Sequence, residues 1–105
     1  LGGLWEFPGG KREPEETLQQ TAVREVREEL GVQVRVREFF IKVDHQYTHF
    51  SVTLNVFHCD WVSGSPQSLG CSDWRWVRPR ELETFAFPRA NGKIIEALLD
   101  SIARS

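Results

Sequence analysis

The stretch that decides the fold, Gly9–Val32, reads GGKREPEETLQQTAVREVREELGV. Its second half carries the signals of one helix. Thr17 with Gln20 three residues later is a capping-box pattern, so the helix should begin at Thr17, and Gly31 is a typical stop. Apolar residues at helical spacing predict a buried stripe between these limits, formed by Leu18, Ala22, Val23, Val26 and Leu30.

Three glutamates, Glu25, Glu28 and Glu29, share another face of this helix. A turn of about 100° per residue sets that face roughly perpendicular to the apolar stripe. One interpretation is a solvated charged face with Arg24 and Arg27 as partners. The other is a ligand site, since carboxylate oxygens suit Mg²⁺ or Mn²⁺ better than softer metals.

The loop before the helix favours the ligand site. Gly9 and Gly10 allow the main chain to approach a ligand closely. Glu16 adds a fourth carboxylate just before the helix cap. Because Mg²⁺ held by few carboxylates usually completes its coordination with substrate phosphates, these residue types indicate chemistry on a phosphate compound.

The same stretch resembles the signature of the Nudix hydrolase family, a glycine, a glutamate, then R-E-U-x-E-E-x-G-U with U an aliphatic residue. The fixed positions are filled by Gly10, Glu16, Arg24, Glu25, Val26, Glu28, Glu29, Gly31 and Val32. The resemblance implies metal-dependent hydrolysis of a nucleoside diphosphate linked to another group. It also implies an α/β fold, an α/β/α sandwich with a mixed, mainly antiparallel sheet.

Residue roles follow from this resemblance. The implied metal ligands are the carboxylates of Glu25, Glu28 and Glu29 and the carbonyl of Gly9. Arg24 is expected to hold Glu16 by a salt bridge that fixes loop against helix, and Glu25 is the candidate to take a proton from the attacking water. The implied substrate-binding residues are Glu6, Phe7, Pro8, Gly9, Gly10 and Asn91.

Asn91 has two interpretations. The FPxAN pattern around it resembles the MutT-type segment whose asparagine hydrogen-bonds oxidised guanine, and an amide offers both a donor and an acceptor to a purine edge. Asparagine is also a preferred N-cap, so Asn91 could instead cap the last helix. The apolar stripe of that helix is Ile94, Ile95, Leu98, Leu99 and Ile102.

Alternating patterns predict strands at 4–7, 32–43 and 50–57, and a shorter one at 74–77 followed by a short helix from Pro79. We expect one of the two tryptophans in the 74–77 segment to pack in the core. Where related proteins carry a further loop carboxylate, this chain has Gly70, and Asp73 is the nearest acid.

The composition fits one soluble domain covering residues 1–105. A formal charge of -2 argues against a general polyanion-binding surface. We find no membrane-spanning run and expect a cytoplasmic protein in which Cys59 and Cys71 are free thiols. Nudix domains ordinarily carry further strands before the signature, so we expect that the chain is N-terminally truncated.

Two functions compete. The first is a Mg²⁺-dependent nucleoside triphosphate pyrophosphohydrolase of the MutT kind, which converts oxidised nucleotides such as 8-oxo-dGTP to the monophosphate and pyrophosphate. The alternative is the C-terminal 8-oxoguanine-recognition domain of a MutY-like adenine glycosylase, because the sequence 47–50, YTHF, resembles its Phe-Ser-His element. DNA is a partner only in that case. The intact set of carboxylates and the mildly acidic pI near 5.9 favour the hydrolase.

Overall fold

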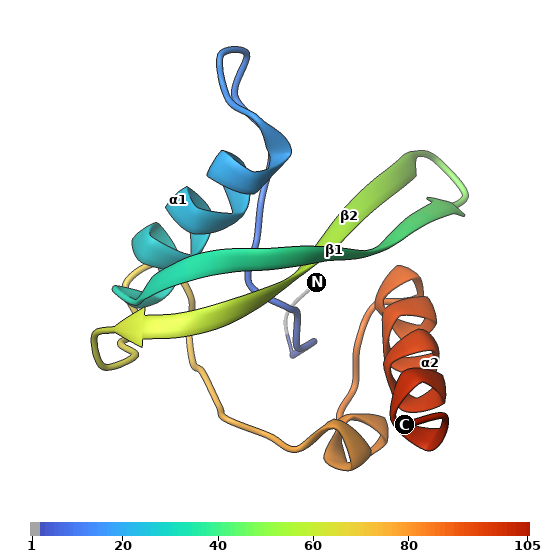
Figure 1. Cartoon of the computed structure of the whole chain (residues 1–105). Coiled ribbons are helices and arrows are strands. Elements are labelled where there is room, and N and C mark those ends of the chain that lie inside the picture. The colour runs from blue at the N-terminus through green and yellow to red at the C-terminus, as the bar shows by residue number, and fades with distance from the viewer. Residues whose placement is uncertain (1–2) are drawn as a thin grey trace. The chain divides into compact units, whose positions relative to one another are not determined.

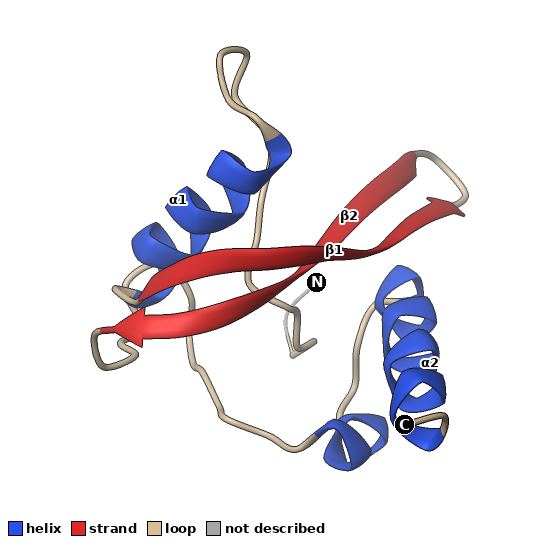
Figure 2. Cartoon of the chain, viewed as in Figure 1, coloured by secondary structure: helices blue, strands red, loops and turns tan. Residues whose placement is uncertain are grey.

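The structure is a computed structural model and describes residues 3–105. Its elements, in chain order, are α1 (Leu18–Leu30), β1 (Gln33–Gln46), β2 (Ser51–Ser63), the 3₁₀ helix η1 (Pro79–Thr84) and α2 (Arg89–Ala103) (Figures 1 and 2). The two strands pair in one two-stranded sheet. They form a hairpin whose turn is closed by the Tyr47 N–H, which donates to the Phe50 carbonyl at 2.7 Å. The predicted α/β class is therefore confirmed.

The chain folds as two compact units. The α1 unit comprises residues 8–40 and 57–75, and so contains α1, the open end of the hairpin and the loop after β2. The α2 unit comprises residues 41–56 and 76–105 with the segment that ends at Phe7, and so contains the hairpin turn, η1 and α2.

The ends of α1 follow from its local sequence, as predicted. The Thr17 hydroxyl accepts from the Gln20 N–H at 3.1 Å, and the Gln20 side chain accepts from the Thr17 N–H at 2.8 Å. Gly31 ends the helix with φ 68°, a left-handed conformation that costs glycine little. The loop after β2 completes this end, because the N–H groups of Leu69 and Gly70 both donate to the Glu29 carbonyl at 3.0 Å.

The apolar stripe of α1 is less covered than predicted. Leu18 stays 40% exposed, and the rest of the stripe is half-buried. The buried side chain of α1 is instead Thr21, which is 6% exposed. Val32 and Val34 supply the buried apolar side chains of the α1 unit, since a two-stranded hairpin offers the helix only a narrow surface.

The α2 unit has the larger buried apolar group, made of Val43, Leu82, Ala90, Ile94 and Ile95. The predicted stripe of α2 is confirmed on its first two members, which are buried, while the three that follow are half-buried.

Two predicted strands are wrong. Residues 4–7 form no regular strand; they carry one backbone hydrogen bond, from Trp5 N–H to the Ala86 carbonyl, and Pro8 has no N–H to extend a ladder. Residues 74–77 also lack strand structure, and the Trp74 N–H donates instead to the Asp73 side chain. The tryptophans of this segment are 37% and 65% exposed, so neither is a core residue.

Among the described residues, no helix has the length and apolarity needed to cross a membrane. Cys59 and Cys71 are half-buried free thiols, as expected. Burial raises the pKa of the Cys59 thiol, and the neighbouring Asp60 carboxylate adds to the effect.

Candidate active site at the loop–helix junction

Arg24 joins the glycine loop to α1. Its Nε and Nη2 donate to the two carboxylate oxygens of Glu16 at 2.5 and 2.9 Å, and Nη2 also donates to the Lys11 carbonyl at 3.1 Å. The Arg24 and Glu16 side chains are 16% and 15% exposed. The predicted ion pair is confirmed, and its two-pronged geometry is one that lysine could not provide.

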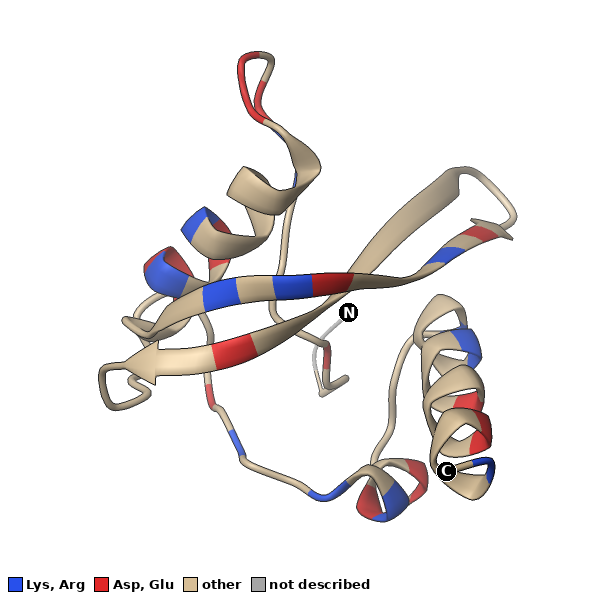
Figure 3. Cartoon of the chain, viewed as in Figure 1, with Lys and Arg blue, Asp and Glu red and all other residues tan. Residues whose placement is uncertain are grey.

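The same guanidinium reaches two of the three helix glutamates. Arg24 Nη1 donates to Glu25 Oε1 and to Glu28 Oε1, both at 2.8 Å. One cation therefore offsets the mutual repulsion of three carboxylates, including Glu16. Figure 3 shows acidic and basic residues together in the later turns of α1.

The two other groups of the junction come from the glycines. Gly9 N–H donates to Glu29 Oε1 at 2.9 Å. Gly10 lies directly against the Glu25 carboxylate, and a Cβ at this position would overlap it. A larger residue at position 10 would therefore displace the Glu25 carboxylate from its place against the loop.

The donor set fits a hard divalent cation, but the carboxylates are not gathered around one point. Within residues 3–105, no group of three or more His, Cys, Asp or Glu side chains is arranged to hold a metal ion. Glu25 and Glu28 contact Arg24, while Glu29 accepts from Gly9. Glu28, at 55% side-chain exposure, is the carboxylate freest to turn toward a cation. The predicted metal ligands stay a prediction.

Sequence reasoning missed Thr21. Its hydroxyl donates to Glu16 Oε1 at 3.0 Å, which gives the Glu16 carboxylate a second side-chain donor beside Arg24. The sequence does indicate a role for Thr21 near the site, because Thr21 lies one helical turn before Glu25 and therefore on the same face of the helix. A small buried hydroxyl there is consistent with support for the loop.

These contacts hold the pKa of Glu16 at about 2, below its ordinary 4.5, chiefly through hydrogen bonds from Arg24. A carboxyl with a lowered folded-state pKa stabilises the fold above its unfolded pKa and loses that contribution as the pH falls through the folded value. We therefore expect Glu16→Gln to lower the melting temperature near neutral pH. The deficit should shrink as the pH falls from 4.5 toward 2.

Thermal melts of wild type and Glu16→Gln across this range measure the effect. Glu15→Gln is the matched control, since it removes the charge of the neighbouring exposed glutamate and leaves the Arg24–Glu16 pair in place. A deficit that stays constant down to the lowest pH would contradict the assignment of the stabilisation to the ionised Glu16.

The α2 unit holds the predicted base-reading residues. Phe7 stacks on Phe87 with ring centroids 5.3 Å apart. Asn91 is 9% exposed, and its Oδ1 is a buried atom without a hydrogen-bond partner. The capping interpretation of Asn91 is wrong, because α2 begins at Arg89 with Pro88 at the N-cap. Glu6 and Pro8, also predicted to bind substrate, are exposed.

The loop position that lacks a carboxylate lies beside α1. A Cβ on Gly70 would approach Glu29 Cα to 3.3 Å, so residue 70 adjoins the helix glutamates. Asp73 Oδ1 accepts from the Trp74 N–H at 2.8 Å, and a replacement of the missing acid by Asp73 stays untested.

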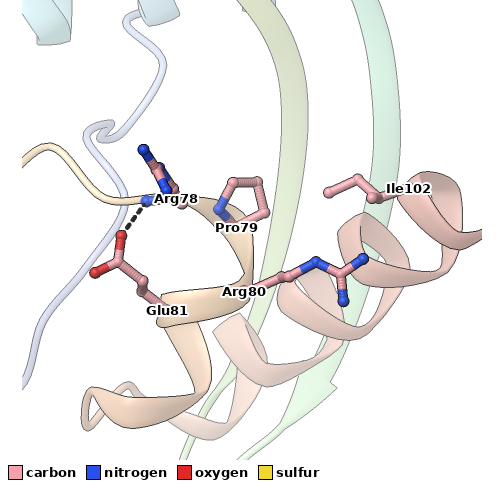
Figure 4. A pocket seen from close by; sticks show the side chains of 5 residues that line it. All are labelled: Arg78, Pro79, Arg80, Glu81 and Ile102. Atoms are coloured by element: carbon pink, nitrogen blue, oxygen red, sulfur yellow. Dashed lines mark hydrogen bonds between the residues drawn. The ribbon is translucent and has the colours of Figure 1, made fainter.

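A separate hollow in the α2 unit contains none of the predicted site residues. Arg78, Pro79, Arg80, Glu81 and Ile102 line it (Figure 4). Its polar contact is structural, since the Arg78 N–H donates to Glu81 Oε1 at 2.8 Å and so closes the start of η1.

The α/β fold, the glycine loop and the carboxylate-bearing helix are those of a nucleotide-processing hydrolase. The model of the NUDIX domain family matches residues 1–97, and the chain belongs to this family. The predicted Nudix hydrolase is thereby confirmed. Nudix hydrolases generally use divalent metal cations and act on nucleotides.

Among similar proteins, a CTP pyrophosphohydrolase of Escherichia coli is 33% identical over 97 residues, which are 92% of this chain and 72% of that protein. An 8-oxo-dGTP diphosphatase of Buchnera aphidicola is 34% identical over 95 residues, 90% of this chain and 77% of that protein. The solution structure of the E. coli ORF135 protein has a TM-score of 0.86 at 33% identity, covering 97% of this chain and 73% of that one. The MutT protein of Methanosarcina mazei has a TM-score of 0.81 at 25% identity, covering 97% and 75%.

Proposed function

We propose that this protein is a Mg²⁺-dependent pyrophosphohydrolase that converts a nucleoside triphosphate to its monophosphate and pyrophosphate. The observation that carries the proposal is the contact set of Arg24, which connects the glycine loop through Glu16 to Glu25 and Glu28. This network brings the carboxylates of Glu16, Glu25 and Glu28 together at the end of the glycine loop.

The residues divide the work. Glu25, Glu28 and Glu29 hold the cation, with the Gly9 carbonyl as a further oxygen ligand. Bound Mg²⁺ supplies neutralisation of the phosphate charge and makes water a better nucleophile near neutral pH. Glu25 accepts the proton of the attacking water, and its position against Gly10 keeps that carboxylate at the loop. Arg24 orients the set without contacting substrate.

The base is an oxidised purine in this proposal, with 8-oxo-dGTP as the preferred substrate. Asn91 supports it, because a buried amide oxygen without a partner costs about 1–3 kcal/mol unless a ligand supplies a donor. The N7–H of an 8-oxopurine is such a donor, whereas N7 of guanine is an acceptor. CTP is the competing substrate, since a relative of similar identity is a CTP pyrophosphohydrolase.

The test measures pyrophosphate release from 8-oxo-dGTP, dGTP and CTP, with and without Mg²⁺, on wild type and Asn91→Ala. We expect Mg²⁺-dependent release with the highest kcat/KM for 8-oxo-dGTP. Asn91→Ala should lower the preference over dGTP by roughly 1–3 kcal/mol, which is about 5- to 150-fold. Asn55→Ala, which alters a half-buried asparagine of β2, is the matched control.

The outcomes separate the parts of the proposal. A highest kcat/KM for CTP would replace the oxidised purine but keep the hydrolase. An unchanged ratio in Asn91→Ala would exclude base reading by this residue. No Mg²⁺-dependent release from any of the three nucleotides would contradict the proposed reaction.

The DNA-recognition alternative also has a structural counterpart. The turn between β1 and β2 presents His49 and Phe50 as exposed residues, with Phe50 58% exposed. A titration with duplex DNA that contains 8-oxoguanine tests it. We expect weak binding to this duplex and to undamaged duplex alike, since the net charge of -2 offers little attraction for phosphate backbones.

A further inference from the structure

Tyr47 lies in the turn between β1 and β2 and contacts two aromatic neighbours. Its ring stacks on Phe50 with centroids 4.9 Å apart and meets the edge of His45 at 4.5 Å. Its N–H closes the turn onto the Phe50 carbonyl. The ring therefore has little freedom to move, and the direction of its hydroxyl is fixed.

The Tyr47 hydroxyl contacts the first turn of α2. It accepts a hydrogen bond from the Ala90 N–H at 3.1 Å, across 43 residues of sequence. Ala90 is the second residue of α2, where N–H groups have no partner within the helix. A second link lies close by, from Lys93 Nζ to the Asp44 carbonyl at 3.1 Å. The hydroxyl contact holds the backbone of the turn of α2 that carries Asn91, whereas the Lys93 link is an exposed side-chain contact.

Two residues of the α2 unit near Tyr47 carry buried atoms without a partner. Among the described residues, the buried side-chain nitrogen and oxygen atoms without a hydrogen bond are His45 Nδ1 and Asn91 Oδ1. His45 touches the Tyr47 ring, and Asn91 directly follows the residue that the Tyr47 hydroxyl binds. Buried polar groups are usually paired, so Asn91 Oδ1 is an acceptor that a donor from a ligand would satisfy.

We infer that Tyr47 is a positioning residue for base recognition: its hydroxyl fixes the start of α2 so that the Asn91 amide meets the base edge. The inference rests on the proposed purine-binding function. Selectivity by a hydrogen-bonding group depends on its exact placement, because a displaced amide leaves its own atoms or those of the ligand unpaired. A hydroxyl that never touches the base therefore still controls discrimination.

Tyr47→Phe is the sharpest variant, since it deletes one hydroxyl and keeps both ring contacts. We expect the selectivity, the ratio of Kd for dGMP to Kd for 8-oxo-dGMP, to fall about three- to tenfold, the usual value of one hydrogen bond. The monophosphates are chosen because their binding requires neither metal nor hydrolysis. Lys93→Met is the matched control, because it removes the neighbouring link between the same two elements.

Calorimetric titrations of the full chain, run below the lowest melting temperature of the set, compare wild type, Tyr47→Phe, Asn91→Ala and the double variant. If Tyr47 acts through Asn91, the double variant should match Asn91→Ala alone, because the lost hydroxyl then has nothing left to position. Lys93→Met should keep most of the selectivity.

The possible failures are distinct. A wild type without preference for 8-oxo-dGMP would contradict the purine proposal and this inference with it. Selectivity lost in Asn91→Ala but kept in Tyr47→Phe would overturn the inference alone. Additive losses of selectivity in the double variant would show that Tyr47 acts independently of Asn91. Equal losses of selectivity in Tyr47→Phe and Lys93→Met would show that Tyr47 only stabilises the fold in general. Either result would overturn the inference.

Discussion

Glu29→Gln should lower kcat for nucleotide hydrolysis by about 100-fold or more. Removal of one group that stabilises the transition state typically reduces the rate by this amount. The substitution removes a charge and keeps the shape. Glutamine retains the oxygen that accepts from the Gly9 N–H, so the loop contact survives. The loss therefore reports on the cation and the reaction, with the fold unchanged.

Three measurements define this result: kcat at saturating substrate, Mg²⁺ affinity by calorimetry and the melting temperature. Mg²⁺ affinity should fall together with kcat, and the melting temperature should stay near that of wild type. Glu96→Gln, on the exposed side of α2, is the matched control and should behave as wild type in all three. Near-wild-type turnover in Glu29→Gln would show that the catalytic assignment of the helix glutamates is wrong.

The features that the sequence predicted well are local ones. The bounds of α1 depend on Thr17, Gln20 and Gly31. Each forms hydrogen bonds with groups no more than four residues away in the chain, so the sequence alone is enough to predict them. The link between Arg24 and Glu16 was predictable for a different reason, since it belongs to the family signature. Family resemblance thus supplied a contact that periodicity alone does not reveal.

The wrong predictions depended on distant partners. An alternating pattern at 74–77 is compatible with a strand, but a strand also needs a neighbouring backbone, and here the Trp74 N–H finds the Asp73 side chain. Asparagine is a residue type that often caps helices, but Asn91 lies two residues after the first residue of α2, because Pro88 occupies the N-cap position. The sequence also did not predict that residues 67–71 bind the carbonyl groups at the C-terminal end of α1. That contact depends on the path of the loop after β2, which local sequence patterns do not specify.

The arrangement of the carboxylates was also beyond the sequence. Spacing places Glu25 and Glu28 on one face, but it does not say that one guanidinium contacts both and Glu16 as well. The structure shows the ion pairing with Arg24 that the solvated-face interpretation predicts, and the metal-site interpretation stays a prediction. Arg24 is an ion-pair partner of the glutamates, and it also holds them beside the glycine loop.

Arg24→Ala should consequently lower the melting temperature by several degrees and reduce kcat by more than tenfold. The variant leaves the Glu16 carboxylate, which is largely buried, without its main partner, and removes the donor to the Lys11 carbonyl. Glu25 and Glu28 lose the cation between them, so their repulsion is no longer offset. Stability and activity should therefore fall together.

Three comparisons assign these losses. Glu28→Gln should reduce activity with little change in melting temperature, because its side chain is 55% exposed and it leaves the Arg24–Glu16 pair in place. Arg24→Lys should recover part of the stability and less of the activity, since an ammonium group keeps the charge but cannot serve Glu16, Glu25 and Glu28 in one planar fork. Arg27→Ala, an exposed arginine of the same helix, controls for the loss of one positive charge. Wild-type stability in Arg24→Ala would show that the arginine orients the glutamates without joining loop to helix, and full recovery of activity by Arg24→Lys would show that its charge alone is sufficient.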